Sequence, residues 1–257
     1  MTYRSVGVLA AHRAGVYLAK HFRKIRKQDI RLKKRHEVLT SADLGANKII
    51  LKILKRHFPS HDFLSEETGL EENPQTYKWF IDPLDGTTNY SVGNPLFCTT
   101  LSLAHGNDLL LSIIYAPMLD EFYIAEKGKG ATLNGKRIHV SPERRPTHSI
   151  ITIGYAHTFK SRLRIAHSLQ YLWKAFLNTR VLGSGSLNLA FVAAGRVEGC
   201  YLALTSNLWD TTSGVLLVKE AGGIVTDLNG KPWDMKSQSL VASNRTIHAR
   251  LLRNVRR

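Results

Sequence analysis

The sequence predicts a layered α/β fold in which helices cover sheets of two kinds. Three observations carry this prediction. Helical patterns fill the first sixty or so residues, short strands joined by tight turns occupy the middle, and strands alternate with helices over the second half. Sheets flanked by helices stack in layers, because each apolar sheet face must be buried against another element.

Two helices are expected ahead of the strands. Residues 3–27 carry apolar side chains at intervals close to the helical repeat. A second helix is expected after Thr40, which precedes Asp43 by three positions in the spacing of a capping box. Pro59 should end this helix, because proline lacks the backbone N–H that an interior helical position donates.

The middle of the chain changes to the repeat of β-strands. Strands are expected at 99–104, 109–115, 121–126 and 130–133. The pairs Gly106-Asn107 and Asn134-Gly135 mark turns, and the second is a strong hairpin signal because both residues tolerate positive φ. An antiparallel meander is therefore predicted here.

The second half alternates between the two repeats and ends with two short strands and a closing helix. Strands are expected near Ile150, near Arg180 and at 199–202, and helices from about Lys160, Ser186 and Trp209. No repeat, low-complexity tract or long Pro/Gly/Ser linker separates the parts. We expect residues 1–145 and 146–257 to be two lobes of one functional domain.

Composition favours a cytoplasmic protein without a membrane partner. The chain has 257 residues, of which 43% are hydrophobic. It holds no apolar run of the roughly 18 to 20 residues that a spanning helix needs, and no signal-like apolar segment near its start. Cys98 and Cys200 lack CxxC spacing, so buried free thiols are expected rather than a disulfide or a zinc site.

Charge is the unusual property of the composition. Lys and Arg number 36 against 20 Asp and Glu, a net charge of +16. Nine basic residues and one acid lie between Lys20 and Arg35, and five arginines with no acid between Asn244 and Arg257. Such blocks attract polyanions or anionic metabolites, and they are equally compatible with a merely solvated surface.

Acidic residues are informative in so basic a chain. They form three groups, at 65–68, 82–87 and 209–210. In the second group an apolar strand ends at Asp82, Pro83 interrupts the ladder and Gly86 permits a tight turn. The loop can aim the carboxylates of Asp82 and Asp85, with the Leu84 carbonyl between them, at one point. Oxygen ligands of this kind suit Mg²⁺.

Each acidic group also has a purely structural interpretation. Asp82 and Asp85 can accept hydrogen bonds from backbone N–H groups in an Asx-type turn. Asp210 can cap the helix that follows it, and the Glu66-Glu67 pair can belong to a solvated loop. The three groups taken together favour a site over these alternatives.

Two segments resemble the signatures of the inositol monophosphatase family. Residues 79–90, Trp-Phe-Ile-Asp-Pro-Leu-Asp-Gly-Thr-Thr-Asn-Tyr, resemble the first signature. Residues 209–214, continuing to the Glu-Ala-Gly-Gly at 220–223, resemble the second. The similarity extends over nearly the whole chain. It implies a layered αβαβα sugar-phosphatase fold with an N-terminal antiparallel-sheet lobe and a C-terminal α/β lobe, and a homodimer typical of relatives.

The resemblance also implies roles for individual residues. The Mg²⁺ ligands would be Glu66, Asp82, the Leu84 carbonyl, Asp85 and Asp210. The catalytic residues would be Asp43, Thr87 and Glu67, with Asp43 and Thr87 orienting and deprotonating the attacking water. The substrate-binding residues would be Asp85, Gly86, Thr87, Gly183, Ser184, Gly185 and Asp210.

The function implied is Mg²⁺-dependent hydrolysis of a phosphoric monoester in a small metabolite. Two positions depart from the family pattern: Ser65 replaces a glycine, and Ala203 stands where inositol-type members often carry a glutamate that contacts sugar hydroxyls. The substrate therefore stays open among inositol phosphate-like compounds, sugar phosphates and nucleotide bisphosphates. The alternative is a basic protein of this fold that binds RNA or a transcription complex, either instead of catalysis or beside it.

Overall fold

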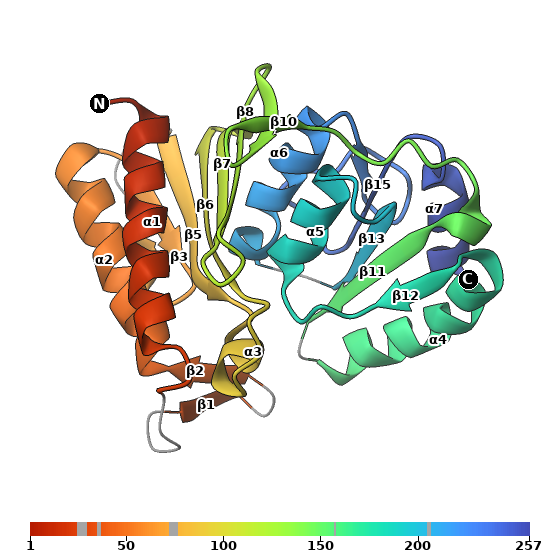
Figure 1. The fold of residues 1–257 in the computed structure, drawn as a ribbon, viewed down its shortest axis with the longest axis horizontal. Coiled ribbons are helices and arrows are strands. Elements are labelled where there is room, and N and C mark those ends of the chain that lie inside the picture. The colour runs from red at the N-terminus through yellow and green to blue at the C-terminus, as the bar shows by residue number, and fades with distance from the viewer. Residues whose placement is uncertain (25–29, 35–36, 72–76, 157, 205–206) are drawn as a thin grey trace.

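The computed structural model describes residues 1–24, 30–34, 37–71, 77–156, 158–204 and 207–257. Helices and sheets alternate in five layers (Figure 1), which confirms the predicted αβαβα fold. From one outer face to the other the helical layers are α1 (Tyr3–His21) with α2 (Ser41–His57), α5 (Gly185–Ala193) with α6 (Thr212–Glu220), and α4 (Phe159–Ala175) with α7 (His248–Arg256).

The first sheet has eight strands and lies between the first two helical layers. Its order is β10-β9-β8-β7-β6-β5-β3-β4, and all neighbours are antiparallel except β3 and β5. The bounds are β3 Asp62–Ser65, β4 Gly69–Glu71, β5 Tyr77–Asp85, β6 Cys98–His105, β7 Asp108–Ala116, β8 Glu121–Glu126, β9 Gly130–Leu133 and β10 Lys136–Ile138. Asn134 and Gly135 form the β9–β10 turn, both at positive φ, so the predicted meander is confirmed.

The second sheet has five strands in the order β12-β11-β13-β15-β14. Its central strand β13 is parallel to β11 and antiparallel to β15. The bounds are β11 Ile150–Tyr155, β12 Asn178–Arg180, β13 Gly199–Ala203, β14 Ile224–Thr226 and β15 Leu240–Ser243. A separate antiparallel pair, β1 (Ile30–Lys34) and β2 (Glu37–Thr40), precedes α2.

Two helix boundaries correct the sequence-based expectation. Helix α1 ends at His21 rather than at residue 27, because Phe22 turns to an extended conformation and packs its ring on Tyr90 and Phe97; residues 25–27 lie outside the described part. The helix expected from Trp209 begins only at Thr212, and Leu208–Asp210 form a separate 3₁₀ turn, η3.

The central core joins the two halves of the chain. One cluster of buried side chains combines strands of the first sheet, such as Phe80 and Ile114, with Leu189 and Val215 on the middle helices. Cys98 and Cys200 are buried free thiols, as predicted. Among the described residues, no helix is both long and apolar enough to cross a bilayer.

Candidate functional site

Strand β5 breaks at the residues that the acidic motif singled out. Asp82 pairs with Thr100 and Asp85 with Cys98, so the register shifts across Pro83 and Leu84. Pro83 cannot donate to a ladder, and its carbonyl instead accepts a hydrogen bond from the Thr99 hydroxyl at 2.9 Å. The strand therefore ends in a short, fixed loop.

Asp82 is the most strongly perturbed acid of this loop. Its side chain is 2% exposed and accepts a 2.9 Å hydrogen bond from the Leu84 N–H. Burial first, and then the charges of Glu66, Asp85 and Asp210, raise the pKa of Asp82 well above its ordinary value. Three chain segments thus bring carboxylates within electrostatic reach of one buried carboxyl.

Asp85 connects the loop to the middle helical layer. Its carboxylate accepts hydrogen bonds from the Ser184 hydroxyl at 2.8 Å and from the N–H groups of Gly185 and Ser186 at 3.2 and 2.6 Å. Burial raises the pKa of Asp85 and these hydrogen bonds oppose the rise. The Asx interpretation is correct in part, because Asp82 and Asp85 both accept backbone N–H groups, but those of Asp85 come from the other half of the chain.

Asp43 and Thr87 meet as the resemblance implied. The Thr87 hydroxyl lies 3.0 Å from Asp43 Oδ1 and 3.0 Å from the Leu84 carbonyl. The other Asp43 oxygen accepts from the Thr40 hydroxyl at 2.5 Å and from the Thr40 N–H at 2.9 Å, the predicted capping box. Asp43 therefore caps α2 and faces Thr87 with the same carboxylate.

Burial shifts the protonation of Asp43 into the neutral range. The side chain is 2% exposed, and burial raises the pKa of Asp43 to about 6 against the opposing hydrogen bonds of Thr40. The charge of Glu67 adds to the rise. Glu67 thus lies within electrostatic reach of Asp43, whereas Glu66 acts on Asp82.

Ser65, which departs from the family pattern, anchors the segment that carries both glutamates. Its side chain is fully buried and donates a 2.8 Å hydrogen bond to Asn47 of α2. It also accepts from the Glu67 N–H at 3.4 Å, while the Glu66 N–H donates to the Ile81 carbonyl at 3.1 Å. The serine hydroxyl thus ties the end of β3 to α2, and the Glu66 N–H ties it to β5.

Asp210 lies in η3, ahead of α6. The N-cap of α6 is Thr211, without a side-chain capping bond, so the interpretation of Asp210 as a helix cap is wrong. The turn is tied to the first sheet, because the Thr100 hydroxyl donates to the Trp209 carbonyl at 3.4 Å. Asp210 is thereby presented from the second half of the chain toward Asp82.

Asn89 is a residue of the site region whose role the sequence did not reveal. Its amide donates to the carbonyls of Leu96 at 2.6 Å and of Leu182 at 2.7 Å, which joins the loop after β5 to the loop before α5. Gly183 follows at φ +78°, and a Cβ there would lie 2.8 Å from the Asn89 amide. Only its place within the first signature marked Asn89 in the sequence.

The carboxylates do not form a closed ligand cage. Among the described residues, no group of three or more His, Cys, Asp or Glu side chains is arranged closely enough to hold a metal ion. The expected ligand roles of Glu66, Asp82, Leu84, Asp85 and Asp210 therefore stay predictions, as do the substrate contacts of Gly86, Gly183, Ser184 and Gly185.

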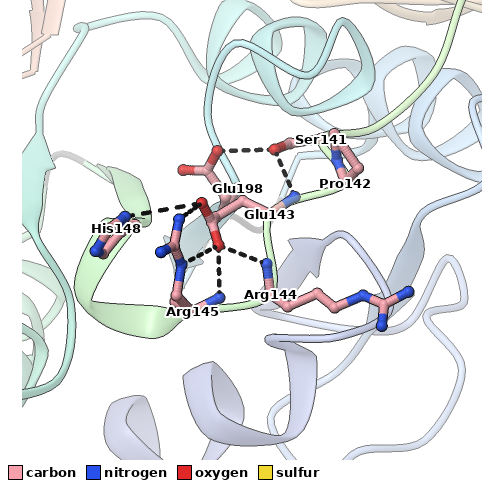
Figure 2. A pocket seen from close by; sticks show the side chains of 7 residues that line it. All are labelled: Ser141, Pro142, Glu143, Arg144, Arg145, His148 and Glu198. Atoms are coloured by element: carbon pink, nitrogen blue, oxygen red, sulfur yellow. Dashed lines mark hydrogen bonds and ion pairs between the residues drawn. The ribbon is translucent and has the colours of Figure 1, made fainter.

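An open pocket lies elsewhere and contains none of the expected site residues. It has a volume of about 700 Å³ and is lined by the segment from Ser141 to His148 with Glu198 (Figure 2). Glu143 is bound there by the guanidinium of Arg145, and Glu198 accepts from Ser141 at 2.9 Å. Both carboxylates are bound by neighbouring groups, so we interpret this network as holding the connection between the two sheets.

The family follows from a match over the full chain. The model of the inositol monophosphatase family matches residues 2–257. The chain belongs to this family. Both predicted signatures lie inside the match, and they contribute Asp82, Asp85, Thr87 and Asp210 to the site just described.

Relatives within the family carry two kinds of name. An inositol-1-monophosphatase of Mesorhizobium japonicum is 34% identical over 98% of this chain and 96% of its own. The Nus factor SuhB of Escherichia coli is also 34% identical, over 98% of this chain and 95% of its own. The solved structure of the extragenic suppressor protein SuhB of Bartonella henselae superposes with a TM-score of 0.94 at 32% identity, covering 99% of this chain and 98% of that one. Sequence and structural similarity alone therefore do not distinguish an inositol monophosphatase from a SuhB-type protein.

We predict that Gly86→Ala destabilises the protein more than Gly106→Ala. Both glycines have positive φ, 97° and 60°, so each substitution costs about 1 kcal/mol of backbone strain. A Cβ at Gly86 would also lie 3.0 Å from the Leu96 carbonyl oxygen, whereas none meets a neighbour at Gly106. The expected loss is about 2 to 3 kcal/mol for Gly86→Ala, measured by urea denaturation. Equal losses would show that the loop after β5 is not tightly fixed.

Proposed function

We propose that the protein is a Mg²⁺-dependent phosphomonoesterase that acts on a small phosphorylated metabolite. The observation that carries the proposal is the carboxyl of Asp82, whose pKa is raised first by burial and then by the charges of Glu66, Asp85 and Asp210. Like charges gathered in a poorly solvated place repel one another unless a cation neutralises them. A bound divalent cation offsets this repulsion. The free-energy cost of gathering the carboxylates is then explained by metal binding.

The donor set fits Mg²⁺ in its chemistry. Carboxylate oxygens from three segments and a backbone carbonyl at Leu84 are hard ligands of the kind that Mg²⁺ selects, and Mg²⁺ usually takes water and phosphate oxygens as its remaining ligands. We assign Glu66, Asp82, Asp85, Asp210 and the Leu84 carbonyl as ligands. When bound, the metal polarises the phosphate and lowers the pKa of a coordinated water.

The protein itself supplies the base and the orientation of the nucleophile. Thr87 donates its hydroxyl proton toward Asp43, so its oxygen is left to accept a hydrogen bond from water. Asp43, with a pKa of about 6, is ionised at neutral pH and can take up a proton passed through Thr87. We place Glu67 behind Asp43, where its charge keeps that carboxylate basic.

The segment leading into α5, residues 183–185, is proposed to act on the substrate mainly through Asp85. The Ser184 hydroxyl and the Gly185 N–H are already bonded to that carboxylate. We therefore assign them to holding Asp85 in position, while Gly86, Thr87, Asp210 and the neighbouring Gly183 line the place of the phosphate and its alcohol. On this view the two lobes, 1–145 and 146–257, act as one functional unit.

The identity of the alcohol is left open by Ala203. Its methyl group is fully buried in the cluster that includes Ile165 and Tyr201, under the outer helices. It therefore offers no acceptor for sugar hydroxyls. The candidates are an inositol phosphate-like compound, a sugar phosphate and a nucleotide bisphosphate.

Asp82→Asn should abolish Mg²⁺-dependent release of phosphate and leave the fold intact. The amide can still accept the Leu84 N–H, and it removes the most strongly perturbed charge of the cluster. We would measure phosphate release from inositol phosphates, fructose 1,6-bisphosphate, histidinol phosphate, adenosine 3′,5′-bisphosphate and NADP.

Thermal unfolding gives a second readout of the same substitution. Saturating Mg²⁺ should stabilise the wild type by about 1 to 3 kcal/mol, and Asp82→Asn much less, because a ligand stabilises only the state that binds it. In the absence of Mg²⁺ the variant should be at least as stable as the wild type. A wild type that Mg²⁺ does not stabilise would refute the metal site.

Thr87→Val should lower kcat by about 10² to 10³ with little change in KM. Valine has nearly the shape of threonine but cannot link Asp43 to a water. Thr88→Val, at the exposed neighbouring position in the short helix α3 (Thr87–Ser91), is the matched control and should keep full activity. Similar kcat values for the two variants would exclude the Asp43–Thr87 pair as the proton-transfer route.

We also propose a homodimer, formed at the edge of the second sheet. Strand β12 is an edge strand, and Trp173, Leu177 and Val181 beside it are 62%, 59% and 56% exposed. Leu177→Asp with Val181→Asp should convert the protein to a monomer in analytical ultracentrifugation. Val16→Asp, which changes a 47% exposed valine on α1, should leave the association state unaltered. A wild type that sediments as a monomer would end this proposal.

A second candidate role is the binding of RNA or a transcription complex, beside catalysis. The Escherichia coli relative is named a Nus factor, and the net charge of +16 favours a polyanionic partner. The Lys20–Arg35 cluster includes residues 25–29 and 35, which lie outside the described part, and no side chain from 30 to 34 is described. The arginines near the C-terminal end are described.

A further inference from the structure

Helix α7 presents an outward face made almost entirely of arginine. Leu251 and Val255 are buried against the second sheet, while Arg250, Arg253 and Arg256 are exposed. A helix rises 1.5 Å per residue, so these guanidinium groups follow one another over about 9 Å along the axis. The helix contains no acidic residue.

Helix α4 extends this basic face. The two helices cover the same side of the second sheet (Figure 1). The Ser168 hydroxyl of α4 donates to the Val255 carbonyl of α7 at 3.4 Å, and the Arg257 guanidinium lies 5.7 Å from the centre of the Tyr171 ring. The basic residues of α4 are Lys160, Arg162, Arg164 and Lys174, all exposed, and this helix also lacks acids.

The cationic side chains of this outer layer, on α4 and α7, form no ion pair within the part of the chain that the structure describes. In the opposite outer layer, by contrast, Arg4 of α1 pairs with Glu126 at 3.3 Å. An uncompensated cluster of this size repels itself and gains from an external anion.

We propose that the outer face of α4 and α7 binds the phosphate backbone of RNA, which deepens the second candidate role and rests on it. Guanidinium groups match phosphate oxygens in pairs, and several in a line suit a chain of regularly spaced phosphates. The outward face of α7 has no large apolar side chain, but α4 exposes Phe159, Leu163 and Trp173, so a lipid surface is tested as the competing partner. The partly exposed Tyr171 beside Arg257 offers a ring on which a base can stack.

The test compares two charge reversals of equal size on the full chain. One variant carries Arg250→Glu with Arg253→Glu on α7, and its control carries Lys48→Glu with Lys52→Glu on exposed positions of α2. Binding of a labelled oligouridylate about 20 nucleotides long is followed by fluorescence anisotropy between about 50 and 150 mM KCl. Thermal unfolding and phosphate release confirm that each variant is folded.

The α7 variant should bind at least tenfold more weakly than the wild type, and the control within about twofold of it. The slope of log Kd against log salt should fall by about 1.4 in the α7 variant, since each phosphate contact to a single strand contributes about 0.7. Arg250→Gln with Arg253→Gln should show a smaller loss in the same direction. It avoids placing glutamate at the negative end of the helix dipole.

The other outcomes contradict the proposal in distinguishable ways. Equal weakening by both reversals would mean that RNA binding depends on the net charge of the protein. That result would overturn the outer face of α4 and α7 as the binding surface, but not RNA binding itself. No binding by the wild type at 150 mM KCl would overturn both, and it would leave the phosphatase proposal untouched. Equally tight, arginine-dependent binding to phosphatidylglycerol vesicles would overturn RNA as the partner.

Discussion

The fold is organised around a like-charge constraint: it holds several carboxylates near one buried carboxyl, Asp82. Such an arrangement costs free energy unless each group is fixed by other interactions. The Leu84 N–H binds Asp82, and the Thr99 hydroxyl fixes the carbonyl of Pro83 between them. The rigid β5–β6 pairing carries these groups, so the free energy that gathers the charges comes from the sheet and its core.

The contact between Asp85 and α5 makes the site depend on both halves of the chain. A carboxylate at a helix N-terminus is favourable, because the free N–H groups and the helix dipole both stabilise negative charge. Asp85 occupies the start of α5, and Asn89 joins the adjacent loops through its amide. The acid that repels Asp82 is thereby held in place by attraction to the start of α5.

The predictable features were those coded by neighbouring residues. Asn134-Gly135 defines a hairpin, Pro83 breaks a ladder, and Thr40 with Asp43 forms a capping box, each within a few positions. The features that escaped depend on distant contacts. Phe22 ends α1 because its ring packs on residues nearly seventy positions away, and the partners of Asn89 include a carbonyl 93 residues along the chain. Metal binding by the expected ligands likewise depends on the distances between their oxygen atoms, which the sequence does not specify.

Acidic and basic residues lie in different parts of this molecule. The proposed hydrolysis uses the buried acids, and the proposed RNA binding uses the basic outer helices. The outer helices α1, α2, α4 and α7 contain one acid, Asp43, which is buried in the site. The outer helices therefore present cations, while most of the described acids lie at loops and strands, with Asp43 and Asp82 buried in the site. A negative interior cluster alone would repel an anionic substrate, and a divalent cation bound among its carboxylates would offset this repulsion. Screening limits each field to about 8 Å in physiological salt, so the outer face of α4 and α7 can hold one anion while the interior cluster acts on another.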